Sequence, residues 1–196
     1  MIVGYTLIMS ILSEIPLGEL ELIIEENPKL RGIMQGYIAE YKLIDRLRNI
    51  FGVTEVSKIP DRHRVKRDLQ IKYLGTDITI ECKSIISSTV KWDTIRGTWQ
   101  GTVQCKNSDA VYSKDYLDTP KRTNLTRGGF DIMSISTYAI DGLWDAVYIE
   151  NRYMPQSTYD RFDIMKTSFV VNPLTTPCIE MDLEKILKST RDYKLK

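Results

Sequence analysis

The chain has 196 residues, of which 42% are hydrophobic and 27% charged, and its formal net charge is +1. This length and composition are those of one globular domain with a core of its own, and they exclude a disordered chain or a uniformly basic nucleic-acid coat. Three cysteines without a Cys-x-x-Cys pair indicate neither a disulfide framework nor a zinc site.

The N-terminal stretch Met1–Leu12 is apolar, but it has no basic leader and no small-residue cleavage site. It is also too short to span a bilayer. We therefore expect a cytoplasmic protein without a membrane segment.

Two helices are expected next. The first covers Leu17–Glu26 and stops at Pro28. The second begins at Pro28, which suits a first helical turn, and ends near Gly52. Its apolar positions follow the i, i+3, i+4 spacing of an amphipathic helix: Leu30, Ile33, Met34, Tyr37, Tyr41, Ile44 and Leu47.

The rest of the chain predicts mainly strands and one closing helix. Residues 87–101 are expected to form a loop with a short helix, and residues 107–129 a long functional loop. The strands are expected at Val53–Ser57, Val65–Leu74, Asp77–Ile86, Thr102–Lys106, Asp131–Tyr138, Trp144–Ile149 and Ser168–Val171, and the helix at Met181–Thr190.

This order of elements predicts an α/β (α+β) fold, in which a central mixed β-sheet is flanked by helices. We expect a single domain over residues 1–196, with a core at about 28–150 and a C-terminal strand and helix in 151–196. Charge is unevenly distributed, because residues 58–130 carry 14 Lys and Arg against 8 Asp and Glu. The segment with the second and third strands is thus the basic part, which can attract a polyanion.

The hairpin formed by these two strands carries the clearest functional signal. A two-residue turn at Gly75-Thr76 pairs Leu74 with Asp77, and a slip of one residue would turn Asp68 to the apolar face. This register and the period of two place four polar side chains on one face: Asp68, Gln70, Glu81 and Lys83.

Two carboxylates beside an ammonium are costly to hold together unless a divalent cation compensates. The oxygens of Asp68 and Glu81 suit Mg²⁺, or Mn²⁺ in its place, and neither ion needs a histidine-rich site. Lys83 can hold or help deprotonate an attacking water and can neutralise charge in the transition state. The constellation indicates metal-assisted hydrolysis of a phosphodiester.

Glu40 on the long helix is a candidate fourth member of this site. It flanks the apolar stripe, where a carboxylate needs a partner. It is predicted to act as an outer ligand or as a ligand of a second metal, and the alternative is a plain salt bridge to a Lys or Arg.

At these residues the chain resembles the PD-(D/E)xK nuclease superfamily, especially its restriction-endonuclease-like members. The likeness rests on Glu40, Asp68 and Glu81-Cys82-Lys83, and a weaker one extends over residues 36–150. Arg67-Asp68 stands where the family has Pro-Asp, which leaves nearby Asp61 as an alternative acid.

The resemblance implies a restriction-endonuclease-like core and Mg²⁺-dependent cleavage of double-stranded DNA, often by a homodimer. In that reading Asp68 and Glu81 bind the metal and Lys83 assists the water. A restriction-type endonuclease is the leading prediction. The alternatives are a structure-selective repair or junction-resolving nuclease, and an inactive DNA-binding protein with a nuclease fold.

A rival site is formed by Gln104-Cys105-Lys106 with Asp93 as its acid, but an amide oxygen binds metal less strongly than a carboxylate. Gln104 and Lys106 are instead expected on a neighbouring strand. Phosphates and bases are expected to be contacted by polar and basic residues after the catalytic strand: Lys91, Arg96, Gln104, Lys106, Lys121, Arg122, Asn124 and Arg127.

Overall fold

The computed structural model describes residues 15–60, 67–105, 125, 128–156, 166 and 168–196. The chain divides into two compact units, residues 1–38 and 39–196. Nothing in this division tests the expected single nuclease domain, which stays a prediction. Within the described part, no helix combines the length and the apolar character that crossing a membrane requires.

The first unit contains α2 (Leu17–Glu26), at its predicted bounds, and the beginning of α3 (Pro28–Arg48). The second unit contains the rest of α3, which ends before the predicted Gly52. The expected apolar stripe is buried only at its end. Ile44 and Leu47 are buried together with Leu43, whereas the large apolar side chains before them are exposed: Leu30, Ile33, Tyr37 and Tyr41. The spacing therefore located the helix correctly but overestimated its buried length.

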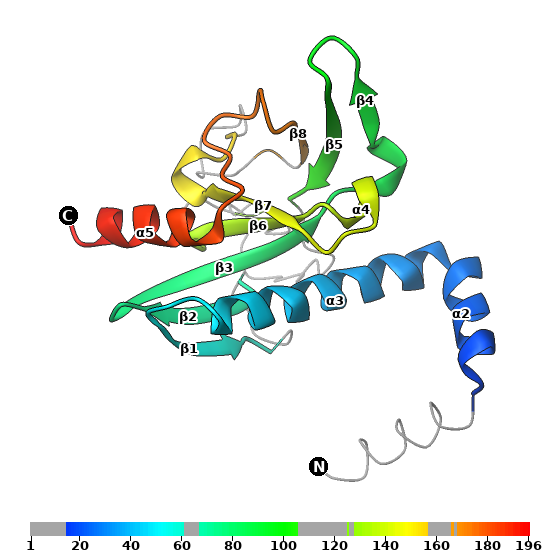
Figure 1. Ribbon diagram of the computed structural model, residues 1–196, viewed down its shortest axis with the longest axis horizontal. Coiled ribbons are helices and arrows are strands. Elements are labelled where there is room, and N and C mark those ends of the chain that lie inside the picture. The colour runs from blue at the N-terminus through cyan, green and yellow to red at the C-terminus, as the bar shows by residue number, and fades with distance from the viewer. Residues whose placement is uncertain (1–14, 61–66, 106–124, 126–127, 157–165, 167) are drawn as a thin grey trace, which may run out of the picture. The chain divides into compact units, whose positions relative to one another are not determined.

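The second unit is built on a five-stranded mixed sheet in the order β1-β2-β3-β6-β7 (Figure 1). All neighbours are antiparallel except β3 and β6, which are parallel. This arrangement confirms the predicted α+β class with a mixed sheet. Its strands are β1 (Val53–Lys58), β2 (Leu69–Tyr73), β3 (Thr76–Ser84), β6 (Ile132–Ser136) and β7 (Ala146–Glu150).

A second sheet of three strands has the order β4-β5-β8. It consists of β4 (Lys91–Asp93), β5 (Thr98–Gln104) and β8 (Ser168–Val171), and β8 lies at its predicted bounds. For residues 87–101 the sequence predicted a loop with a short helix. The short helix is present as η1 (Ser87–Thr89). The predicted loop was wrong, because β4 and half of β5 pair there as a ribbon. The predicted loop at 107–129 lies almost wholly outside the described residues.

The remaining elements connect or cover the sheets. The predicted hairpin of β6 and β7 is confirmed, but its connection contains the short helix α4 (Tyr138–Asp141). The helix η2 (Asn151–Tyr153) follows β7. The last helix is α5 (Leu183–Lys194), which starts later than predicted because the Asp182 carboxylate caps it by accepting from the N–H groups of Glu184 and Lys185.

The predicted register of the β2–β3 hairpin was wrong by two residues. Tyr73 pairs with Thr76, and the turn residues are Leu74 and Gly75, both with positive φ. Positive φ at both positions gives a turn whose twist matches that of the two strands. Because the error is an even number of residues, the polar and apolar faces remain as predicted.

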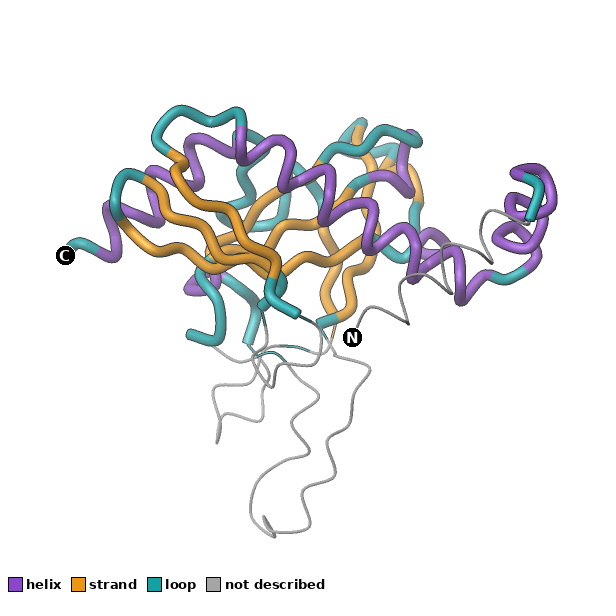
Figure 2. The backbone as a smooth tube through the Cα atoms, turned by 90° about the horizontal axis from the view of Figure 1, so that it is seen from below, coloured by secondary structure: helices purple, strands orange, loops and turns teal. Residues whose placement is uncertain are grey.

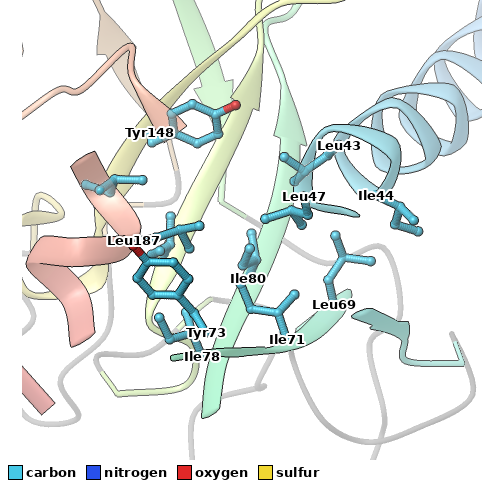
Figure 3. Close-up of a cluster of buried hydrophobic side chains, with 12 residues drawn as sticks. Leu43, Ile44, Leu47, Leu69, Ile71, Tyr73, Ile78, Ile80, Tyr148 and Leu187 are labelled. Carbon is cyan, nitrogen blue, oxygen red and sulfur yellow. The ribbon is translucent and has the colours of Figure 1, made fainter. Parts of the chain in front are cut away.

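Two apolar clusters lie on the two faces of the five-stranded sheet. On one face, Leu43 and Leu47 of α3 and Leu187 of α5 pack with Ile78 and Ile80 of β3 (Figure 3). On the other face lie side chains of β6, the second sheet and neighbouring segments, among them Met133, Ile135, Val103 and Val171. Figure 2 shows helices on one side of the strands. The sheet is therefore covered on both faces, which allows polar groups on β3 to be buried.

The packing of α5 gives a stability prediction. Leu187 is fully buried in the first cluster, whereas Leu195 at the end of the same helix is 64% exposed. We expect Leu187→Ala to destabilise the protein by about 2–5 kcal/mol, because it removes buried contacts and leaves a cavity. Leu195→Ala is the matched control and should cost less than about 0.5 kcal/mol. Chemical denaturation measures both, and equal effects would contradict the assigned packing.

Candidate active site

Glu81 is the centre of the candidate site. It lies on β3, pairs with Met133 of β6 and so shares the face that the second cluster covers. Its side chain is only 2% exposed. One carboxylate oxygen, Oε1, accepts from Lys83 Nζ at 2.5 Å, and the other, Oε2, is buried without a hydrogen-bond partner among the described residues. A buried acceptor of this kind is rare unless something else binds it.

Asp68 lies immediately before β2, where the pairing of β2 with β3 ends. Its N–H donates to the carbonyl of Ile80 at 3.0 Å, and its Oδ2 accepts from the N–H of Cys82 at 2.6 Å. At the end of the β2–β3 ladder, the Asp68 carboxylate thus takes the place of a backbone carbonyl as the acceptor for the Cys82 N–H. This hydrogen bond holds the Asp68 side chain against the segment that contains Glu81. Because Leu69 pairs with Ile80, the observed register brings Asp68 directly beside this part of β3.

Lys83 completes the group. Its side chain is 19% exposed and its ammonium contacts Glu81. Burial by itself would lower the pKa of Lys83, but the nearby carboxylates of Glu81 and Asp68 outweigh burial and raise the pKa above its ordinary value. Lys83 is therefore protonated in this arrangement, which favours holding a water or a phosphate oxygen over removing a proton from the water.

Burial has the opposite effect on the acid. It is the main reason that the pKa of Glu81 is raised to about 7; Lys83 opposes this rise, and the charges of Asp68 and Glu40 add to it. The charges of Lys83, Asp68 and Glu40, the other side chains predicted as catalytic, thus all act on Glu81. Their catalytic roles stay a prediction.

Glu40 combines features of both interpretations that the sequence left open. It projects from α3, and its Oε2 lies 2.6 Å from Nζ of Lys58 on β1, in an ion pair that is mostly buried. Its charge also acts on Glu81 and Cys82. Glu40 therefore has the salt bridge of the plain interpretation, and its role as an outer ligand stays a prediction. The sequence offered no signal for Lys58, because the two residues meet only through packing.

The donor set agrees with a hard divalent cation. Asp68 and Glu81 are two neighbouring carboxylates, and one buried oxygen of Glu81 has no other described partner. No cluster of three or more His, Cys, Asp and Glu suited to a metal occurs within the described ranges. Mg²⁺ keeps several waters and needs only one or two carboxylates, so this pair is enough for Mg²⁺ but not for a closed zinc site.

The rival site does not assemble. Asp93 sits at the turn between β4 and β5, where its carboxylate binds the N–H groups of Ile95 and Arg96 and the Arg96 guanidinium. It pairs with Thr98, whereas Gln104 is six residues further along β5, or about 20 Å away. These contacts explain why the pKa of Asp93 is lowered, chiefly by Arg96.

The other predicted DNA contacts are only partly visible. Lys91 and Gln104 are exposed on the second sheet, and Arg96 is half-exposed while it pairs with Asp93. Gln104 precedes Cys105, on which the charges of Lys83 and Glu81 act. The alternative acid Asp61 lies outside the described residues. So do the remaining predicted contacts, which are Lys106, Lys121, Arg122, Asn124 and Arg127.

Comparison with known proteins leaves the family open. No protein-family model matches the chain, and no curated protein matches it significantly. Among solved structures, one similar chain is that of a bacterial homing endonuclease, with 16% sequence identity and a TM-score of 0.45. The alignment covers 87% of this chain and 99% of that chain. A likeness of this strength does not identify a function, which must be argued from the carboxylate–lysine group itself.

Proposed function

We propose that this protein is a metal-dependent endonuclease that hydrolyses phosphodiester bonds in double-stranded DNA. The observation that carries the proposal is the group of Asp68, Glu81 and Lys83, in which one buried Glu81 oxygen has no other described partner. A structural ion pair between Lys83 and Glu81 alone accounts neither for the second carboxylate beside it nor for the unsatisfied Glu81 oxygen.

Each residue has a distinct role in this proposal. Asp68 and Glu81 would hold Mg²⁺, with Mn²⁺ as a substitute, and the cation would supply Lewis acidity at the scissile phosphate. Lys83 stays protonated, orients the attacking water and neutralises charge that builds up on the phosphate oxygens. Glu40, fixed by Lys58, adds negative charge at the back of the site.

The finer parts of the proposal follow from the resemblance to PD-(D/E)xK nucleases. They are a restriction-type activity and a homodimer that cuts both strands. The basic character of residues 58–130 supports DNA as the polyanion. The same superfamily is supported by the order of the elements, with Glu40 on α3, Asp68 immediately before β2, and Glu81 and Lys83 on β3.

The proposal predicts that the protein cuts plasmid DNA with Mg²⁺ and does not cut it in EDTA. Gel electrophoresis followed by sequencing of the ends is the measurement. Discrete fragments support a restriction-type enzyme, and cleavage restricted to branched oligonucleotides points to a structure-selective nuclease. Tight DNA binding with no cleavage under any divalent cation would overturn the enzymatic proposal in favour of a binding protein.

A further inference from the structure

The β4–β5 ribbon is a projecting element (Figure 1) that the catalytic group does not use. Its tip is fixed by Asp93, which accepts from Ile95 N–H and from Arg96 N–H, both at 3.2 Å, and from Arg96 Nη1 at 2.9 Å. The carbonyl of Asp93 also accepts from Gly97, whose positive φ closes the turn. The tip is therefore organised before any partner arrives.

The base of the ribbon is fixed as well. Thr89 Oγ1 accepts from the N–H of Thr102 at 2.8 Å, and the Thr102 carbonyl accepts from Ile86 at 2.9 Å. At Gly101 an added Cβ would lie 2.4 Å from Ile85 Cγ2, so the ribbon packs directly on the segment that follows β3. A rigid ribbon loses little conformational entropy when it binds.

The side chains of the ribbon divide by face. Trp99 and Val103 of β5 face the second apolar cluster. The alternate residues Thr98, Gln100 and Thr102 are polar, and exposed Lys91 on β4 pairs with Gln100. Because the Asp93 carboxylate is engaged by Arg96 at the tip, Lys91 is the one cation of this face without an ion-pair partner among the described residues, and its neighbours both donate and accept hydrogen bonds.

The ribbon also carries large apolar side chains that are exposed. Ile95 is 90% exposed and Trp92 is 63% exposed. Exposed apolar groups on a rigid, projecting element indicate a contact with a partner. The most exposed of them, Ile95, lies in the turn between β4 and β5.

The ribbon starts beside the catalytic group. Val103 bridges to Ile85, which is two residues after Lys83, and the charges of Lys83 and Glu81 act on Cys105 at the end of β5. Six residues separate Val103 from Gly97, which corresponds to about 20 Å of strand. A DNA duplex rises by the same length over about six base pairs, so a ribbon lying along the duplex reaches about six base pairs from the site of cleavage.

We propose that the β4–β5 ribbon lies in the major groove of the DNA duplex and reads base edges within about six base pairs of the scissile phosphate. A two-stranded ribbon fits the width of this groove. Gln100 can bind an adenine edge through its amide, Lys91 can bind guanine, and Ile95 can contact a thymine methyl group. This inference rests on the proposed nuclease function, because DNA is the partner to which it commits.

Selection of bound duplexes from a random-sequence library tests the ribbon apart from catalysis. The selection is made with Lys83→Met protein in Mg²⁺, with Gln100→Ala or Ile95→Ser added in turn, and the bound DNA is sequenced. Each added change should reduce the preference at one or more base pairs by about 5- to 150-fold. Gln35→Ala in α3 and exposed Leu174→Ser are the matched controls and should leave the base profile unchanged.

The outcomes separate the two proposals. A base preference that both ribbon variants leave intact overturns the ribbon's role, as does binding without any preference. A change from dimer to monomer in Ile95→Ser, measured by light scattering, would assign the ribbon to contacts between proteins instead. Selected base preference without any plasmid cutting by the unsubstituted protein supports the ribbon and refutes the nuclease. Plasmid cutting by the unsubstituted protein, together with binding that shows no base preference, supports the nuclease and refutes the role of the ribbon.

Discussion

Replacing Lys83 with Met, or Glu81 with Gln, is expected to lower the rate of Mg²⁺-dependent DNA cleavage by at least about 1000-fold. The first change removes the ammonium that contacts Glu81 and that we propose orients the water, and the second removes the proposed metal ligand from a buried position. Both replacements are close in size to the original side chains, so circular dichroism should show a folded protein. The single-turnover rate of plasmid cleavage is the measurement.

The sheet offers a matched control pair for this experiment. Lys72 and Glu55 form the same kind of ion pair at 3.2 Å on strands β2 and β1, but both side chains are exposed. Lys72→Met and Glu55→Gln should keep cleavage within a few-fold of the unsubstituted protein, since a surface pair contributes about 0–1 kcal/mol. Equal losses in the buried and the exposed pairs, or full activity of both buried variants, would refute the assigned site.

The stability of the metal-free protein is expected to fall as the pH rises from about 5 to 7. Burial raises the folded-state pKa of Glu81 from 4.5 to about 7. Between these two values the unfolded state releases the proton while the folded state keeps it, so each step up in pH favours unfolding. Above pH 7 the penalty is complete and stays constant, on the order of 1–3 kcal/mol.

Denaturation in EDTA across this pH range measures the effect, and Glu81→Gln is the reference because its side chain does not titrate. The unsubstituted protein should lose stability relative to this variant between pH 5 and 7, and Glu55→Gln should not alter the slope. Added Mg²⁺ should raise the melting temperature more at pH 8 than at pH 6, because the ionised carboxylate binds it. Parallel curves for the unsubstituted protein and Glu81→Gln would show that Glu81 is not a buried titrating acid.

The face of the hairpin that carries the candidate site could be predicted from the sequence, although the register of the hairpin could not. Strands alternate their side chains with a period of two, so any even shift leaves Asp68, Glu81 and Lys83 on one face. The turn was misplaced because a leucine occupies its first position with positive φ, which sequence rules assign to glycine or asparagine.

Elements with strong local signals were also predictable. The helix at Leu17–Glu26 and the strand at Ser168–Val171 have their predicted bounds, because their limits depend on neighbouring residues in the chain. The β4–β5 ribbon was missed, since its short strands are rich in polar and small residues. Its position depends on contacts of Thr89 with Thr102 and of Ile85 with Gly101, which no local pattern encodes.

By itself, then, the sequence determined which carboxylates and which amine share a face, because backbone alternation is a local property of each strand. Only the tertiary structure decided that Glu81 is buried, that Glu40 is paired with Lys58, and that Asp68 binds the Cys82 amide. Burial and pairing depend on how the second sheet and α3 pack against the five-stranded sheet, which no local pattern in the sequence encodes. The raised pKa of Glu81 follows from that burial, and so it too was decided by packing.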